Sequence, residues 1–246
     1  MKEVRYFYVP NALTELQLPE EEAQHAVRVL RLQPDDEMVL IDGVGNFHDA
    51  VITEVSKKHC RYRITATRPQ RKAWTGHLHL AMAPTKNMDR TEWTVEKATE
   101  IGFDELTFLN CLFSERTVVK PERIDKILVS AMKQSRKAEK PRLNDMVPFR
   151  DFIKSVTSTN LYKELTNRFI CHCYEEPSLG EKKLLRDVLQ PGENTLVLVG
   201  PEGDFSIDEV RMAEAAGFQS VSLGQARLRT ETAALVAVHL MNLAHS

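Results

Sequence analysis

The chain is poor in several features that mark particular classes of protein. Its 246 residues include only four cysteines and ten glycines, and aromatic residues make up 7%. Four cysteines in a chain of this length do not indicate a disulfide framework. No apolar run approaches the roughly 18 residues of a membrane span, and the first residues lack the apolar core of a signal peptide. We therefore expect a cytoplasmic protein that does not contact a membrane.

The cysteines do not follow a metal-binding pattern either. Cys171 and Cys173 flank His172 in a strand-like run, so the two cysteines share one face and His172 points to the other. Structural zinc usually takes four ligands from paired motifs, and no second pair follows. We expect no metal, and we interpret all four cysteines (Cys60, Cys111, Cys171 and Cys173) as reduced core residues.

The net charge is small, but the basic residues are unevenly distributed. The formal charge is −2 at pH 7, yet residues 57–72 contain seven Lys or Arg and no acid. Residues 116–142 contain nine basic and three acidic residues. Basic stretches on a near-neutral protein suit RNA contact through one face, although charge runs are more often only solvated surface.

The hydrophobic pattern changes near residue 70. Before it, four segments alternate with a period of two, as strands do (residues 4–8, 38–41, 47–55 and 62–67). One helix interrupts them, starting at Pro19 with three glutamates in its first turn. Residues 1–70 are interpreted as a small β-barrel domain, and a basic linker leads to a second domain over residues 75–246. Strands and helices alternate there, which favours an α/β fold with a mostly parallel sheet.

Two sharp turns in the second domain are the most informative motifs. Gly200-Pro201-Glu202-Gly203 follows the apolar run 195–199, and Ser206 with Glu209 has the spacing of a capping box. Leu223-Gly224 ends a second apolar run, before the long apolar segment 232–244. We expect these runs to be neighbouring strands, with both turns at the sheet edge where ligands bind. The spacing excludes dinucleotide and P-loop motifs, and two ordinary strand-to-helix turns remain the alternative.

These motifs resemble those of the RsmE methyltransferases, a family of the SPOUT superfamily. The resemblance includes the run Arg227-Leu228-Arg229-Thr230-Glu231-Thr232-Ala233 and extends over nearly the whole chain. It implies a PUA-like RNA-binding barrel followed by a trefoil-knotted α/β domain, and a homodimer. It also implies transfer of a methyl group from S-adenosylmethionine to N3 of a uridine in 16S small-subunit ribosomal RNA, free or in the assembled subunit.

The resemblance also implies the site residues. We expect the methyl donor to be bound at the two turns by Val199, Gly200, Pro201, Glu202, Gly203, Leu223, Gly224 and Leu228. Uracil N3 carries a proton, so a base or an anion-stabilising cation is needed near it. The candidate catalytic residues are Arg229, Glu231, Arg90 and Arg116, with helix capping as the alternative role of Glu231.

The candidate RNA contacts lie in both predicted domains. They are Arg28, Arg31, Lys86, Arg90, Gln134, Ser135 and Arg227. Lys86, Arg90, Trp93 and Lys97 have the spacing of one helical face, which either meets RNA or is simply solvated. Gln134 and Ser135 either bind substrate or only end a helix. His172 either borders the donor pocket or is structural.

The sequence departs from the family pattern at Asp204, where a second glycine is usual. Two alternatives to the main interpretation remain. One is another SPOUT RNA methyltransferase that modifies a ribose 2′-oxygen. The other is a non-catalytic RNA-binding protein of ribosome assembly.

Overall fold

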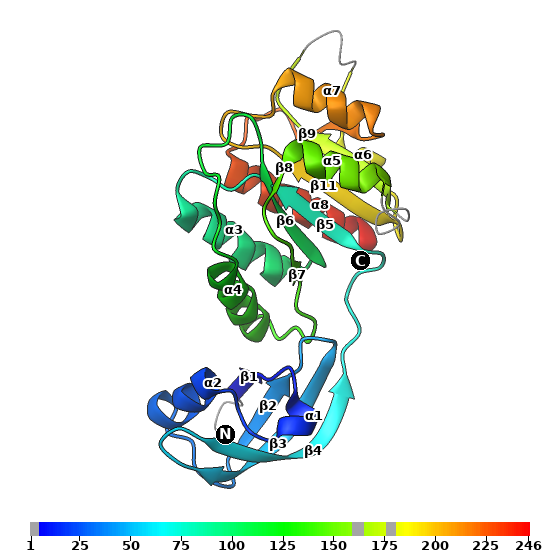
Figure 1. The fold of residues 1–246 in the computed structure, drawn as a ribbon. Helices are drawn as coiled ribbons and strands as arrows, with labels where there is room; N and C mark the ends of the chain where they lie inside the picture. Colours follow the sequence, from blue (N-terminus) through cyan, green and yellow to red (C-terminus); the bar gives the residue numbers. More distant parts are fainter. Residues whose placement is uncertain (1–4, 159–164, 176–180) are drawn as a thin grey trace. The chain divides into compact units, whose positions relative to one another are not determined.

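The chain folds into two compact units in a computed structural model that describes residues 5–158, 165–175 and 181–246. The first unit comprises Met1–Lys72 together with Val129–Lys140, and the second comprises Ala73–Leu128 and Pro141–Ser246 (Figure 1). The sequence predicted domains over residues 1–70 and 75–246. That division assigns residues 129–140 to the second domain, whereas in the structure they belong to the first unit. No helix in the described ranges is long and apolar enough to cross a membrane.

The first unit is built on a four-stranded sheet in the order β1-β2-β3-β4. β1 pairs parallel with β2, and the other pairs are antiparallel. Val9 N, directly after β1, donates to Ile41 O in β2, whereas Leu18 N donates to Cys60 O in β4. The segment that follows β1 at one edge of the sheet therefore also bonds to β4 at the opposite edge. The elements are β1 (Arg5–Tyr8), α1 (Ala12–Glu15), α2 (Glu20–Gln24), the π-helix η1 (His25–Val29), β2 (Glu37–Ile41), β3 (Asn46–Val55) and β4 (Cys60–Pro69).

Both faces of this sheet are covered. One face packs Phe7, Leu40 and Ile52 into a buried cluster beneath α1 and α2. Because strand side chains alternate, Val39 and Ile41 point to the other face, where Met132 and Ala138 cover them. This second cluster explains why residues 129–140 belong to the first unit.

The second unit contains one wholly parallel sheet in the order β10-β12-β9-β11-β5-β6-β7, with β8 also paired to β6. Its strands are β5 (Leu78–Met82), β6 (Glu105–Asn110), β7 (Arg142–Leu143), β8 (Val147–Pro148), β9 (Leu165–Cys171), β10 (Lys183–Leu184), β11 (Asn194–Val199) and β12 (Gln219–Ser222). Its helices are α3 (Met88–Ile101), α5 (Phe149–Ser158), α6 (Leu185–Val188), α7 (Ile207–Ala215) and α8 (Thr230–His245). α4 (Pro121–Gln134) begins in this unit, and its residues from Val129 onward belong to the first unit. The predicted α/β class is confirmed.

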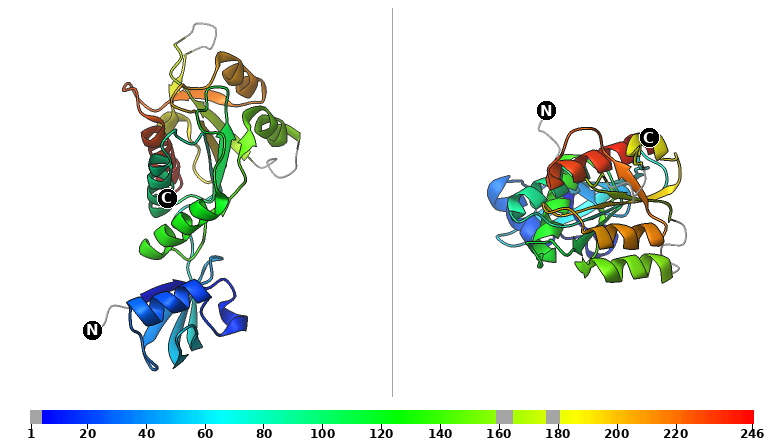
Figure 2. Two further views of the ribbon diagram at one scale, coloured as in Figure 1. Left: turned by 60° about the vertical axis from the view of Figure 1, so that its left-hand side comes forward. Right: turned by 90° about the horizontal axis from the view of Figure 1, so that it is seen from above.

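Helices cover both faces of the parallel sheet. α3, α6 and α8 share one buried cluster with the sheet, and α5 and α7 share another on the opposite face. Figure 2 shows this layering in the view from above, with red α8 on one side of the sheet and orange α7 with green α5 on the other. The sheet residues are therefore buried on both sides, as their near-continuous apolar runs require.

Two predictions about these elements are wrong. The runs before the two glycine turns became β11 and β12, which are not neighbours, because β9 lies between them. Strand order depends on the crossover connections and is not written in local periodicity. In addition, α3 begins at Met88 with Asn87 as its cap, so Lys86 precedes the helix and is not part of a helical stripe.

Candidate active site

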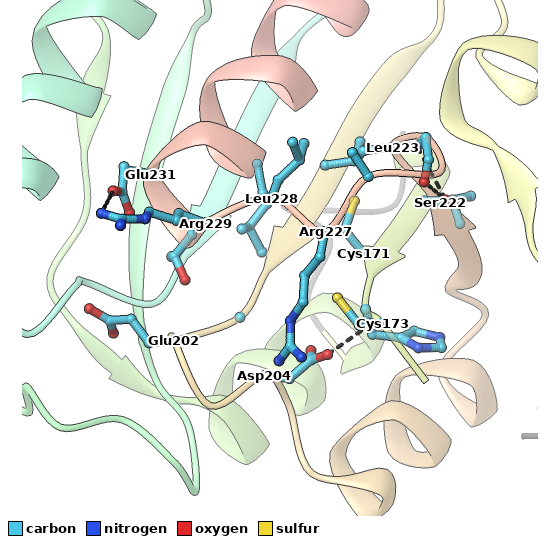
Figure 3. A pocket seen from close by; sticks show the side chains of 18 of the residues that line it. Cys171, Cys173, Glu202, Asp204, Ser222, Leu223, Arg227, Leu228, Arg229 and Glu231 are labelled. Atoms are coloured by element: carbon cyan, nitrogen blue, oxygen red, sulfur yellow. Dashed lines mark hydrogen bonds and ion pairs between the residues drawn. The ribbon is translucent and has the colours of Figure 1, made fainter. Parts of the chain in front are cut away.

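A pocket of about 650 Å³ opens at the carboxyl ends of β9, β11 and β12 (Figure 3). This is the edge at which parallel sheets bind ligands. Most of the sequence-predicted site residues in the second unit meet here. Those lining the pocket are Arg90, Val199, Gly200, Pro201, Glu202, Leu223, Gly224, Arg227, Leu228, Arg229 and Glu231.

The first turn is fixed by short contacts behind it. A Cβ at Gly200 would lie 3.0 Å from the backbone nitrogen of Phe205, a buried residue. The predicted capping box is present, since Ser206 N donates to Glu209 Oε2 at 2.8 Å and Glu209 N donates to Ser206 Oγ at 3.2 Å. The start of α7 thus holds the turn in place, and Gly200 allows the chain to pass close to it.

Gly203 does not line the pocket. A Cβ added at Gly203 would lie 2.9 Å from Cβ of Phe113, in the segment after β6. Leu112 N, in the same segment, donates to Glu209 Oε1 at 2.9 Å. The glycine is therefore required by packing against Phe113, and its expected contact with a methyl donor stays a prediction.

The second turn is open to the pocket. Gly224 has φ +140°, and a Cβ added there would meet nothing within 4 Å. Its amide donates to Ser222 Oγ at 3.2 Å, which ties the turn to the end of β12. Leu223 and Leu228 are half-buried and form an apolar part of the wall (Figure 3). The free space above Gly224 lets a ligand approach the backbone.

Three charged side chains gather where α8 begins. Glu231 is buried, and its Oε1 lies 3.5 Å from a terminal nitrogen of Arg90 and 4.0 Å from one of Arg229. Arg90 comes from the first turn of α3 and Arg229 is the residue before α8. Two elements that are distant in the sequence therefore place two guanidinium groups around one carboxylate.

A second charged group lies where β9 ends. Asp204 has φ +68°, a left-handed conformation, and its carboxylate accepts from Cys173 N and from Phe205 N, each at 2.8 Å. Burial, followed by the charge of Asp204, raises the pKa of the Cys173 thiol. In Figure 3 the Arg227 side chain extends toward Asp204. Cys173 is exposed, so its interpretation as a core residue is wrong, whereas Cys60, Cys111 and Cys171 are buried as predicted. The residue follows the end of β9, which was not expected between the two strands that carry the turns.

The other residue at the end of β9 is less informative. His172 lines the pocket, yet both ring nitrogens are buried without a hydrogen-bond partner in the described structure. Burial, and then the charge of Lys182, lower the pKa of His172. His172 therefore borders this pocket, and a role in donor binding stays a prediction.

Two predicted residues lie beside the pocket and not in its wall. The guanidinium of Arg116 donates twice to Lys86 O, at 3.1 and 2.8 Å. Lys86 N in turn donates to Glu202 Oε1 at 2.9 Å, and the ammonium of Lys86 pairs with Glu115 at 2.6 Å. Arg116 therefore holds the segment before α3 in place and fixes it to the first turn.

The remaining candidate RNA contacts belong to the first unit. Arg28 and Arg31 are exposed around the end of η1, where Arg31 has φ +54°. Gln134 is exposed at the end of α4, and Ser135 Oγ donates to Ala131 O at 2.7 Å. Ser135 thus has a helix-end role, and contact of these four residues with RNA stays a prediction.

The pocket combines features that suit a mixed ligand. Its walls offer an apolar surface, backbone groups of two turns, carboxylates and guanidinium groups. Small-molecule sites usually pair a mainly apolar lining with a few placed polar groups. In the described residues no group of three or more His, Cys, Asp or Glu is arranged to hold a metal ion.

Comparison with known proteins identifies the chain's relatives. Residues 72–242 match the family described as RNA methyltransferase domain, and residues 18–65 match the RNA methyltransferase PUA domain. Ribosomal RNA small subunit methyltransferase E of Aquifex aeolicus is 30% identical over 237 residues, covering 91% of this chain and 92% of that protein.

Solved structures show the same relationship. A probable rRNA-methyltransferase from Porphyromonas gingivalis is 40% identical with a TM-score of 0.89, covering 98% of each chain. A ribosomal RNA small subunit methyltransferase E from Neisseria gonorrhoeae, solved bound to S-adenosyl methionine, is 28% identical with a TM-score of 0.81 and covers 98% of each chain. The chain therefore belongs to the RNA methyltransferase family and, within it, to the RsmE family of ribosomal RNA small subunit methyltransferases that its two turns resemble.

Proposed function

We propose that the protein transfers a methyl group from S-adenosylmethionine to N3 of a uridine in 16S ribosomal RNA of the small subunit. The observation that carries this proposal is the pocket at the carboxyl edge of the sheet. Both turns of the family motif and two arginines beside a carboxylate line it. Its relatives named as ribosomal RNA small subunit methyltransferase E support the substrate, and the donor-bound relative from Neisseria gonorrhoeae supports the donor.

The pocket residues fit this donor. Backbone groups of Val199 to Glu202 and of Leu223 and Gly224 would hold it, with Leu228 against its apolar parts. The open space above Gly224 and the half-buried leucines supply close backbone approach and apolar contact together. The bound donor supplies an electrophilic methyl group, and the protein must align that group with uracil N3.

The first unit is proposed as the RNA-binding domain, over residues 1–70, and residues 75–246 as the methyltransferase domain. Side chains along β4 and before it are exposed and basic, including Lys57, Lys58, Arg61 and Arg63. With Arg28 and Arg31 they would contact phosphates, so binding should weaken steeply with salt through counterion release.

Three finer features belong to the same proposal. The methyltransferase domain would be a SPOUT-type trefoil knot, which the crossing strand order β12-β9-β11 supports. The protein would act as a homodimer in the cytoplasm. Trp93 on α3 and Leu243 on α8 are 44% and 58% exposed, and these two helices pack against each other, so their outer side offers an apolar surface to a second copy.

The test is to incubate the purified protein with labelled S-adenosylmethionine and either 16S ribosomal RNA or small subunits, and then to locate the methyl group on the modified nucleoside. Label on N3 of one uridine is the expected result. Label on a ribose 2′-oxygen would identify a different SPOUT methyltransferase. No transfer to either substrate, together with no donor binding in calorimetry, would indicate a non-catalytic RNA-binding protein.

A further inference from the structure

One oxygen of the Glu231 carboxylate has no hydrogen-bond partner among the residues that the structure describes. Glu231 lines the pocket and is only 9% exposed. Its Oε1 is within ion-pair distance of Arg90 and Arg229, whereas Oε2 is buried and makes no hydrogen bond in the described parts of the chain. A buried acceptor without a donor is costly and calls for an explanation, such as a ligand that is absent.

Capping of α8 does not explain this arrangement. An acidic residue in the first turn of a helix stabilises the helix dipole without being buried. Asp208 stands in the first turn of α7, and its side chain is 94% exposed. Glu231 instead lies buried beside two guanidinium groups, which a capping role does not require.

The two arginines keep hydrogen-bond donors available. Their side chains are 43% and 69% exposed, and their distances of 3.5 and 4.0 Å from Glu231 give no hydrogen bond. No other hydrogen bond in the described structure engages either guanidinium. The pocket therefore presents one carboxylate together with two guanidinium groups, which both lie near its Oε1.

One acceptor and two donor groups are what recognition of the uracil edge requires. Uracil presents the N3–H donor between the acceptors O2 and O4. Resting on the proposed function, we propose that Glu231 accepts the N3–H of the target uracil and is the general base. Arg90 and Arg229 donate to the two flanking carbonyl oxygens. The same arginines stabilise the negative charge that spreads onto those oxygens as the proton leaves.

The step balances without a further reactant. Glu231 takes the proton from N3, and the N3 electron pair forms the new N–CH₃ bond. The bond from that methyl carbon to the sulfonium sulfur breaks, and sulfur keeps the electron pair as a neutral thioether. The proton on Glu231 then passes to solvent after the products leave.

The decisive variant is Glu231→Gln, which keeps size and removes the base. Single-turnover methylation at saturating RNA and donor should fall about a hundredfold or more, within the range of general-base catalysis. Calorimetric affinity for S-adenosylmethionine should stay within about threefold, because Glu231 is assigned to the uracil. Glu231→Asp, which keeps a carboxylate, should recover part of the rate. Asp208→Asn is the matched control and should leave the rate unchanged.

A second substrate separates a base from a structural residue. RNA transcribed with 5-fluorouridine carries a more acidic N3–H, so it depends less on an enzyme base. The ratio of wild-type to Glu231→Gln rates should therefore shrink clearly on this RNA. An equal ratio on both RNAs, a wild-type rate in Glu231→Gln, or loss of donor affinity would overturn the assignment. Failure of the proposed function is distinct, because the wild-type protein itself would then place no methyl group on N3.

Discussion

The two ends of the parallel sheet each have a buried carboxylate nearby, and the two carboxylates differ in how completely they are hydrogen-bonded. At the amino end, Glu105 begins β6 and is 3% exposed, and both of its oxygens are engaged. Oε2 accepts from His77 at 2.8 Å, and Oε1 accepts from Asn144 at 2.6 Å and from Arg142. At the carboxyl end, Glu231 is similarly buried, yet one oxygen has no hydrogen-bond partner in the described structure.

This difference separates a group that supports the fold from one that awaits a ligand. Burial alone raises the pKa of Glu105, but its hydrogen bonds to His77, Arg142 and Asn144 outweigh that effect and hold the pKa well below its usual range. Such a network gains stability from complete pairing. The incomplete pairing around Glu231 costs stability, which is expected of a site whose missing partner is a substrate.

Acid should reveal the structural end most strongly. Burial lowers the pKa of His79, in β5 beside Glu105, to about 4, against an ordinary value of about 6.5. Between about pH 6.5 and pH 4, His79 therefore stays neutral in the folded state but is protonated in the unfolded state. The free energy of unfolding is thus highest above about pH 6.5 and falls as the pH drops toward 4. The loss should reach about 3 kcal/mol, measured by urea denaturation at several pH values.

The control for this prediction is His79→Gln, which cannot titrate. Its free energy of unfolding should change much less between pH 7 and pH 4.5 than that of the wild-type protein. An equally steep loss in this variant would remove His79 as the cause. Stability supplied by Glu105, whose pKa is depressed, should be lost only at lower pH, below the ordinary carboxyl pKa of about 4.3.

At the carboxyl end, Arg229→Ala should damage chemistry and spare the fold. The side chain is 69% exposed, so little packing is lost. Removing one preorganised donor to a developing anion typically costs about a hundredfold in turnover, and single-turnover methylation measures this. Arg229→Lys should recover little, because an ammonium lacks the planar fork. A fall of several degrees in melting temperature without a rate defect would break the proposed contrast between the two ends.

At the carboxyl edge of the parallel sheet, the sequence predicted the local features of the turns but not the order of the strands. The capping box at Ser206 and Glu209 depends on residues three apart, and it formed as predicted. The position of β9 between β11 and β12 depends on crossover connections, and it was predicted incorrectly. As a result, Cys173 was not expected in the pocket. The burial of Glu231 between Arg90 and Arg229 likewise requires contacts over about 140 residues of chain, which no local pattern encodes.

α4 shows the same limit in a single helix. Its apolar stripe is continuous in the sequence, but Ile124 and Leu128 enter the core of the second unit whereas Met132 enters the first. Helical periodicity indicates which residues are buried and does not indicate which core receives them. For this reason the predicted boundary near residue 70 could not include residues 129–140.

Gly203 tests where the ligand-binding part of the first turn ends. Gly203→Ala would bring a Cβ to 2.9 Å from Cβ of Phe113, and overpacking of this kind typically costs roughly 1–3 kcal/mol. We expect lower stability, measured by thermal unfolding, with donor affinity less affected. Adding Phe113→Gly removes the clashing atom and should restore part of the loss. If donor affinity collapses while stability is unchanged, Gly203 belongs to the donor site as the sequence suggested.

Asp204 should give the smallest effect, because two opposing terms nearly cancel. Asp204→Gly relieves a left-handed conformation, worth roughly 1 kcal/mol for a non-glycine residue. It also removes two hydrogen bonds, from Cys173 N and Phe205 N, each worth about 1 kcal/mol. The net loss of stability should be about 1 kcal/mol or less. Asp204→Asn retains the left-handed strain and one carbonyl acceptor, so it should be less stable than Asp204→Gly if the strain outweighs the one hydrogen bond that asparagine keeps. Thermal unfolding of both variants shows whether the backbone strain or the hydrogen bonds of Asp204 have the larger effect on stability, and calorimetry measures whether donor affinity changes. A loss far above 1 kcal/mol in Asp204→Gly would mean that the link from the first turn to β9 is a structural support, like the paired carboxylate at the other end of the sheet.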